Sequence, residues 1–250
     1  MNKRKIMPNT IDFEQAFLQS NDTYLISVLQ KKTEGLYNRF WKRIFDMTMA
    51  IVLLPIAIPI FLIISIIQII TTGFPVIYKP LRGGYREKIF HIFKFRSMIK
   101  NADKIGGGTT AQNDSRITPF GNILRKTKID EIPQLINIII GKMSFVGPRP
   151  ELLQYISNYS NIEKYILYVR PGVTDYSSLK YISLDESVGK ENADEIYEKT
   201  VLHDKNVLRL KYVYELSAKN DIKIFFKTVY EVLKKVFIFM GKKNGKNHNS

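Results

Sequence analysis

Two adjacent carboxylates, Asp130 and Glu131, offer the clearest potential for chemistry in this sequence. They precede Pro133, and a proline near the start with Gly141 past the end predicts a short helix over Ile132–Ile140. The first turn of a helix has free N–H groups and a positive dipole end, which keep a carboxylate ionised and attract phosphate. An ionised aspartate can attack phosphorus, and its neighbour could hold Mg²⁺. Alternatively, the two acids only cap the helix.

A single arginine, Arg149, is held between two prolines in the run GPRP at 147–150. Prolines stiffen the backbone, and a guanidinium fixed in this way suits bidentate contact with phosphate. Lys94, Arg116 and Arg125 add positive charge in the same region. Phosphoryl transfer needs mainly positioning and charge neutralisation, and these residues could supply both. Each of these cations, taken alone, is also typical of a solvated surface.

The composition excludes several other chemistries. The 250 residues contain no cysteine and three histidines that lie far apart. Disulfides, thiolate zinc sites and cysteine nucleophiles are therefore excluded, and histidine-based sites are disfavoured. The 38 Lys+Arg against 23 Asp+Glu give a net charge of +15. Such a surplus indicates an anionic partner, which could be nucleic acid, a membrane face or a phosphorylated substrate.

The uncharged run Met47–Ile70 is long enough to cross a hydrocarbon core of ~30 Å as a helix. It begins too late in the chain to be a signal peptide. Pro55 and Pro59 lie inside it, and each should kink or break the helix. Basic residues flank both ends, and one crossing cannot place both flanks on the cytoplasmic side. We therefore expect a re-entrant helix–break–helix, with a kinked single span as the alternative.

The remaining elements predict an α+β fold that is mostly helical with a small β-hairpin. Strand candidates at 75–78 and 88–95 flank the turn signal Gly83-Gly84. A weak amphipathic pattern covers Ile11–Leu29. Asp221–Met240 repeats apolar residues on one helix face, which either packs on the domain or lies in the membrane interface.

Seven segments, taken together and in this order, resemble the bacterial sugar transferase family, the small monotopic polyprenyl-phosphate phosphoglycosyl transferases. They span residues 42–175, and the stretch through Tyr230 is similar to one branch of the family. The segments are KRIFD at 42–46, the apolar run with its central Pro59, FKFRSM at 93–98, DSRIT at 114–118, LRKTKIDEIPQLIN at 124–137, GKMSFVGPRPE at 141–151 and RPGVTD at 170–175.

This resemblance implies a two-step reaction at the cytoplasmic face of the bacterial inner membrane, with Mg²⁺ as cofactor. Asp130 would attack the β-phosphorus of a UDP-sugar and release UMP, and polyprenol (undecaprenyl) phosphate would then take the sugar phosphate. Glu131 matches the family's Mg²⁺-associated acid and Arg149 its phosphate-binding arginine, with Lys94 and Arg125 as helpers. The product would initiate a glycan such as O-antigen, capsule, exopolysaccharide or a glycoprotein glycan. Nucleic acid is not an expected partner, and the oligomeric state, a homodimer included, is open.

The resemblance also divides the chain. We expect an N-terminal extension at 1–38, the re-entrant membrane segment at 39–72, the catalytic domain at 73–240 and a basic tail at 241–250. Two departures from the family pattern stand out. Ile58 replaces the serine that often precedes the central proline, and TDYSS at 174–178 replaces the common TGWAQ, which could alter the choice of sugar.

Two other functions are compatible with the same sequence. A non-enzymatic, membrane-anchored basic module would bind anionic lipid or nucleic acid through its net charge alone. A membrane-bound phosphatase or nucleotidase would use the same aspartate with water as the acceptor.

Overall fold

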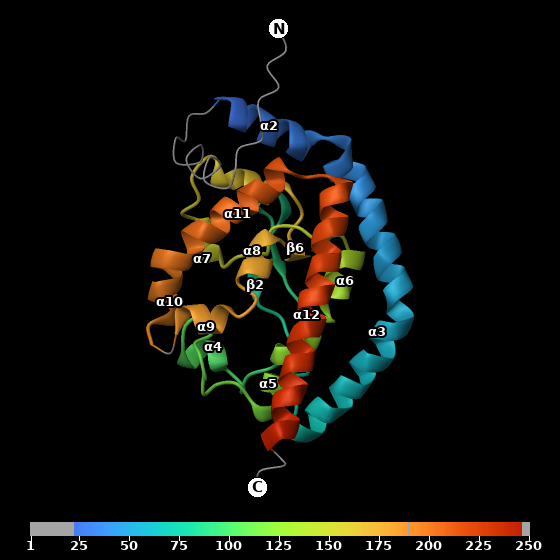
Figure 1. Ribbon diagram of the computed structural model, residues 1–250, viewed down its shortest axis with the longest axis vertical. Helices are drawn as coiled ribbons and strands as arrows, with labels where there is room; N and C mark the ends of the chain where they lie inside the picture. The colour runs from blue at the N-terminus through green and yellow to red at the C-terminus, as the bar shows by residue number, and fades with distance from the viewer. Residues whose placement is uncertain (1–22, 190, 247–250) are drawn as a thin grey trace.

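Helices make up most of the chain, and small sheets lie among them (Figure 1). The structure is a computed structural model that describes residues 23–189 and 191–246. The predicted mostly helical α+β class is confirmed at this level. The helices are α2 (Thr23–Glu34), α3 (Lys42–Thr72), α4 (Ala102–Ile105), α5 (Pro119–Thr127), α6 (Gln134–Ile139), α7 (Leu153–Ile156), α8 (Tyr176–Lys180), α9 (Leu184–Val188), α10 (Ala193–Ile196), α11 (Leu202–Tyr214) and α12 (Ala218–Lys246). Shorter 3₁₀ or π turns are η1 (Tyr37–Trp41), η2 (Tyr85–Glu87), η3 (Ile129–Glu131), η4 (Glu163–Tyr168) and η5 (Tyr197–Val201).

The predicted hairpin is confirmed as two short antiparallel ladders. β1 (Ile77–Tyr78) pairs with β4 (Lys94–Phe95), and β2 (Leu81–Gly83) pairs with β3 (Ile89–His91). The turn between them contains η2. Sequence analysis missed a third sheet, in which β5 (Ser144–Val146) pairs in parallel with β6 (Gly172–Thr174). Each of these strands has three residues, too few for alternation to be recognised.

One hydrophobic core joins elements from both ends of the described chain. Leu29 of α2, Ile138 of α6 and Leu210 of α11 are fully buried in it. α12 adds Ile224 to the same core. The helix predicted over Asp221–Met240 is therefore confirmed, and it packs on the body along one face. The predicted pattern over Ile11–Leu29 falls largely outside the described residues, and α2 begins at Thr23.

The apolar run forms one continuous helix, α3, with both prolines inside it. The predicted break is therefore not seen. Figure 1 shows α3 bowed along one side of the molecule. Proline removes one N–H donor and pushes the preceding turn aside, and a helix of 31 residues tolerates two such sites by bending. With η1, the helix Tyr37–Thr72 is long and apolar enough to cross a membrane, and only 11% of its most apolar stretch is buried.

The N-terminal end of α3 is fastened to the body by buried charges. Lys42 forms an ion pair with Asp221 of α12. One turn later, Asp46 accepts a hydrogen bond of 3.1 Å from the amide of Phe145. Arg43 donates to the carbonyl of Ile139 in α6 over 2.6 Å. The KRIFD segment is therefore an anchor, and Lys42, one of the basic residues that precede the apolar run, is buried in it.

The C-terminal end of α3 is fastened to the same body. Gln68 is fully buried and donates to the carbonyl of Arg96 over 2.7 Å. Arg96 in turn donates to the carbonyls of Thr72 and Gly73 at 2.7 and 2.6 Å. Between the two ends, large apolar side chains are exposed on the outer face. They include Ile51, Val52, Ile56, Ile58, Leu62, Ile63 and Ile66.

Candidate active site

The turn η3 carries both predicted carboxylates between α5 and α6. Lys128 leaves α5 in the left-handed conformation (φ 61°), which turns the chain sharply toward Asp130. The amide of Glu131 is used within this turn, donating to the carbonyl of Lys128 over 3.2 Å. Asp130 is only 7% exposed, and its Oδ1 is buried without a hydrogen-bond partner in the described part of the chain. Burying an unsatisfied acceptor is costly, and a catalytic role or a bound ligand is one explanation for such an atom.

Glu131 is fixed by two cations. Arg149 donates from both terminal nitrogens, to Oε1 and, over 3.1 Å, to Oε2. Lys94 of β4 places Nζ 3.9 Å from Oε1. The bidentate geometry holds the carboxylate and the guanidinium in one orientation. The structure therefore brings together Lys94, Glu131 and Arg149, which are separated by up to 55 positions, beside Asp130.

The two adjacent carboxylates have opposite electrostatic environments. Burial, and then the negative charge of Glu131, raise the pKa of Asp130. Burial would also raise the pKa of Glu131, but Arg149 and Lys94 outweigh it and hold that pKa well below its usual range. We expected the start of a helix to favour the ionised form of Asp130. The shift runs the other way because burial dominates, and titratable neighbours pushed apart in this manner are typical of catalytic pairs.

Two strand ends position Arg149. β5 leads into GPRP, and β6 leads into Asp175. The strands approach so closely that a Cβ on Gly147 would lie 2.4 Å from the carbonyl oxygen of Arg170. Asp175 is fully buried and accepts the amide of Arg149 over 3.2 Å. The Arg149 side chain also donates to the carbonyl of Val173 over 2.7 Å. The backbone and the side chain of Arg149 are thus both fixed by the segment around β6.

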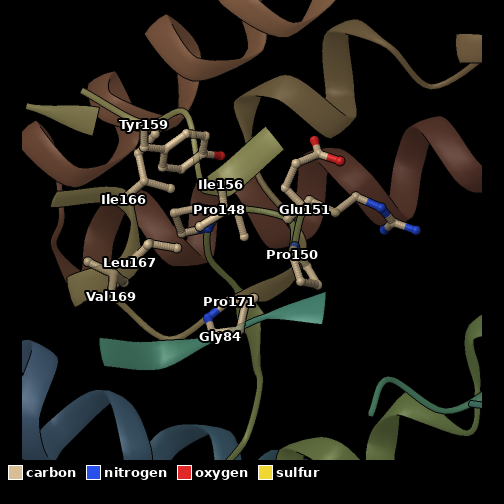
Figure 2. Close-up of a pocket in the computed structure, with 12 residues that line it drawn as sticks. Gly84, Pro148, Pro150, Glu151, Ile156, Tyr159, Ile166, Leu167, Val169 and Pro171 are labelled. Carbon is tan, nitrogen blue, oxygen red and sulfur yellow. The ribbon is translucent and has the colours of Figure 1, made fainter. Parts of the chain in front are cut away.

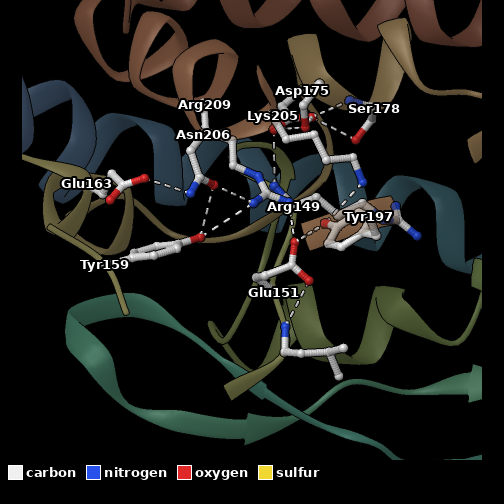
Figure 3. Close-up of polar contacts among 12 residues, drawn as sticks. Arg149, Glu151, Tyr159, Glu163, Asp175, Ser178, Tyr197, Lys205, Asn206 and Arg209 are labelled. Atoms are coloured by element: carbon white, nitrogen blue, oxygen red, sulfur yellow. Dashed lines mark hydrogen bonds and ion pairs between the residues drawn. The ribbon is translucent and has the colours of Figure 1, made fainter. Parts of the chain in front are cut away.

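A buried polar network supports the same segment from α11 (Figure 3). Glu151 accepts hydrogen bonds from Arg209, over 2.9 Å, and from the hydroxyl of Tyr197. Arg209 also donates to Asn206 over 2.9 Å. Lys205 lies over the Tyr197 ring, with Nζ 4.7 Å from its centroid. The network ties the residue two positions after Arg149 to the centre of the fold.

The other two predicted phosphate ligands differ in their placement. Arg125 lies in the last turn of α5, and its charge acts on Asp130. Arg116 is hydrogen-bonded to both oxygens of Asp114 and to the carbonyls of Ala102 in α4 and Gly107 in the loop after it. Its described hydrogen bonds and ion pairs do not include Asp130 or Glu131. Arg116 therefore holds the loop between α4 and α5 together.

Sequence analysis missed two residues of the site. Lys128 acts electrostatically on both carboxylates. Asp175 orients Arg149 through its backbone and also caps α8, accepting the amide of Ser178 over 2.7 Å. The unusual TDYSS segment was the available signal for Asp175. Nothing in the spacing indicated that it would meet Arg149, because β5 and β6 were not predicted.

The donor set fits a magnesium ion only in part. Within the described chain, no three Asp, Glu or His residues gather into a ready-made metal site. Mg²⁺ often binds through one or two carboxylates and completes its shell with water and substrate phosphates. The unpartnered Oδ1 of Asp130 fits that pattern, whereas both oxygens of Glu131 are already shared with Arg149. Asp130 and Glu131 could therefore hold Mg²⁺ if phosphate oxygens supply other ligands.

Comparison with known proteins gives consistent results. The family model described as bacterial sugar transferase matches residues 37–235. The UDP-glucose:undecaprenyl-phosphate glucose-1-phosphate transferase of Escherichia coli (strain K12) is 37% identical, over 78% of this chain and 40% of that protein. The undecaprenyl-phosphate galactose phosphotransferase of Salmonella typhimurium is 32% identical, over 89% of this chain and 46% of that protein.

A third relative differs in the sugar that its name gives. It is the UDP-N-acetylgalactosamine-undecaprenyl-phosphate N-acetylgalactosaminephosphotransferase of Aeromonas hydrophila, 30% identical over 78% of this chain and 44% of that protein. The matched region thus covers less than half the length of each of these three relatives. The family match includes the apolar helix, both carboxylates and Arg149. This chain belongs to the bacterial sugar transferase family.

Proposed function

We propose that this chain is a phosphoglycosyl transferase that moves a sugar 1-phosphate from a UDP-sugar to undecaprenyl phosphate and so initiates a glycan. The observation that carries the proposal is the buried, unpartnered Oδ1 of Asp130 beside the Glu131–Arg149–Lys94 cluster. The names of the relatives, which all give undecaprenyl phosphate as a substrate, support the acceptor. They give glucose, galactose and N-acetylgalactosamine as sugars, so the sugar is open here.

Asp130 acts as the nucleophile. One of its carboxylate oxygens bonds to the β-phosphorus while the bond to the bridging oxygen breaks, and UMP leaves with that oxygen. The sugar 1-phosphate is then an acyl phosphate on Asp130. A phosphate oxygen of undecaprenyl phosphate attacks the same phosphorus, and the Asp130 carboxylate is released. Arg149 and Lys94 neutralise the charge on the phosphoryl oxygens in both steps.

Asp130 and Glu131 together with substrate phosphates are the ligands we propose for Mg²⁺. When bound, the ion would neutralise charge on the diphosphate. Glu131 stays ionised because Arg149 and Lys94 lower its pKa. Arg149 is paired with Glu131 in this structure, and we propose that its guanidinium also contacts the substrate phosphates.

We further propose that α3 enters and leaves the cytoplasmic leaflet of the inner membrane from one side. Its exposed apolar middle needs a lipid environment. Its two ends, at Lys42 and Gln68, are both tied to the same folded body. A body that holds both ends favours re-entry over a crossing, since a crossing would separate the ends across the bilayer.

The test of the function replaces the nucleophile. Asp130→Asn in the full chain, in lipid nanodiscs with undecaprenyl phosphate and Mg²⁺, should abolish UMP release from a panel of UDP-sugars. The matched control is Asp103→Asn, since Asp103 is an exposed aspartate of α4. Wild-type protein given a UDP-sugar with radiolabelled β-phosphate should become labelled before the acceptor is added, and Asp130→Asn should not.

The outcomes separate the alternatives. Turnover by Asp130→Asn at the wild-type rate would reject the nucleophile. Release of free sugar phosphate without lipid product would identify a hydrolase with water as acceptor. Binding of anionic lipid without turnover of any UDP-sugar, unchanged in Asp130→Asn, would favour the non-enzymatic module.

A further inference from the structure

Arg82 lies on β2, which runs against the segment that carries Arg149. The amide of Gly83 donates to the carbonyl of Glu151 over 3.2 Å. Gly83 and Gly84 also line a small cavity of about 10 Å³ together with residues 148–151. Figure 2 shows Gly84 on the opposite side of this cavity from Ile156 and Tyr159, near Pro150 and Pro171. β2 is therefore part of the wall behind the phosphate-binding arginine.

The guanidinium of Arg82 has donors to spare. In the described part of the chain, the Arg82 side chain donates one hydrogen bond, from Nη1 to the carbonyl of the preceding residue, Leu81, over 2.8 Å. It forms no ion pair with a carboxylate in the described part of the chain. Three other arginines of this region are paired with carboxylates: Arg149 with Glu131, Arg209 with Glu151 and Arg116 with Asp114. A half-buried guanidinium with unused donors is suited to an anion from outside the protein.

The charge of Arg82 also interacts with charged residues of the site. Burial, the largest effect, lowers its pKa, and Glu151 offsets this in part. The positive charge of Arg149 lowers the pKa of Arg82 further, and Arg82 in turn lowers that of Lys94. The charges of Arg82, Arg149 and Lys94 thus repel one another, while Glu151 is already engaged by Arg209. An anion with two phosphate groups would relieve this repulsion.

We propose that Arg82 is a third phosphate-binding residue of the site and donates to the diphosphate of the nucleotide-sugar beside Arg149 and Lys94. The inference rests on the proposed function for the identity of that diphosphate. Its fork of N–H donors matches two phosphate oxygens at once, which a lysine cannot reproduce.

The experiment measures binding of two probes, UDP and inorganic pyrophosphate, to the full chain by calorimetry in the presence of MgCl₂. Arg82→Gln should weaken both by about ten- to a hundredfold, as expected for loss of a charge-assisted contact. Arg82→Lys should lose less because it keeps the charge. The matched control is Arg86→Gln, which removes the same charge from the same hairpin. Arg86 is exposed and stacks on Tyr85, 5.3 Å from the ring centroid, so binding should stay within about twofold of wild type.

Each outcome decides the matter. UDP and pyrophosphate binding by Arg82→Gln equal to wild type, or an equal loss in Arg86→Gln, would overturn the role of Arg82. Weakened binding of UDP alone would also overturn it, since the contact must be to phosphate. If the melting temperature of Arg82→Gln is below that of wild type, the affinities of Arg82→Gln and Arg82→Lys for the two probes decide the question. A smaller loss of affinity in Arg82→Lys supports phosphate binding, and equal losses in the two variants would show a structural role. Wild type that binds both probes through Arg82 but releases no UMP would support the inference and reject the transferase.

Discussion

At the scale of single residues, neighbouring carboxylates are separated in role by what touches them. Glu131 is paired with Arg149 and Lys94, so it remains a fixed negative charge. Asp130 has one buried oxygen without a partner. A nucleophile must be free to form a new bond, whereas a charge that orients cations must not move. The unsatisfied oxygen therefore supports Asp130, rather than Glu131, as the proposed nucleophile.

The titration of Lys94 predicts the pH dependence of catalysis. Burial lowers its pKa to about 8, with Glu131 raising it and Arg149 lowering it. Below that pH the ammonium is present and can bind phosphate. Above it the amine is neutral, so kcat/KM, which reports the free enzyme, should fall as pH rises through about 8. Lys94→Arg keeps its charge at all these pH values and should remove the fall.

A second lysine provides the control. Burial also lowers the pKa of Lys205, to about 7, so it titrates in a neighbouring range. It lies in the network around Tyr197 and makes no described contact with Glu131. Lys205→Arg should therefore leave the alkaline fall in place. If the alkaline fall in kcat/KM persists in Lys94→Arg and vanishes in Lys205→Arg, the titrating group is Lys205, and the prediction for Lys94 is wrong.

At the scale of elements, α11 supports the site through a buried ion pair. Arg209 is 1% exposed and Glu151 is 9% exposed. Arg209→Met leaves the Glu151 carboxylate buried without its cation, which should cost ~3–5 kcal/mol of stability. Since ~1 kcal/mol shifts the melting temperature of a protein of this size by ~2–4 °C, the apparent melting point should fall by roughly 10 °C.

The matching control removes an exposed ion pair of the same type. Lys199 and Glu195 lie one turn apart on the surface, and Lys199→Met should leave the melting point unchanged because such pairs are screened by solvent. The double variant Glu151→Gln/Arg209→Met should recover part of the loss, since both charges of the ion pair are then removed. Equal melting points for Arg209→Met and Lys199→Met would contradict the structural role of the network.

The same scale shows what sequence could and could not predict. Long periodic or turn-flanked elements were predictable, including α12 and the hairpin, because their signals are local. The Asp130–Glu131 pair and Arg149 were predictable as chemistry because residue type and proline spacing are also local. The β5–β6 pairing was not, since it joins two three-residue strands whose partners are 28 positions apart. Asp175 was missed as a site residue for the same reason.

At the scale of the whole molecule, α3 and the body form one unit whose outer edge is apolar. A helix of 31 residues is ~46 Å long, more than a ~30 Å hydrocarbon core requires. The length of α3 therefore does not show whether it crosses the membrane. The buried anchors at Lys42 and Gln68 support the proposed re-entry instead, because they bring both ends to one body. The predicted break at Pro59 is not present, and α3 follows the body as a continuous, bowed helix.

The absence of cysteine makes this topology directly testable. Leu36→Cys and Phe74→Cys place one thiol just before and just after the apolar helix, at side chains that are 75% and 66% exposed. In inverted inner-membrane vesicles both should react with a membrane-impermeant maleimide, and in intact spheroplasts neither should. Ile58→Cys, in the exposed middle of α3, should resist the reagent from both sides because lipid covers it. If the two end positions react from opposite sides, α3 crosses the membrane. The anchors at Lys42 and Gln68 could then not both be intact, because one body on one side of the membrane cannot hold both ends of a crossing helix.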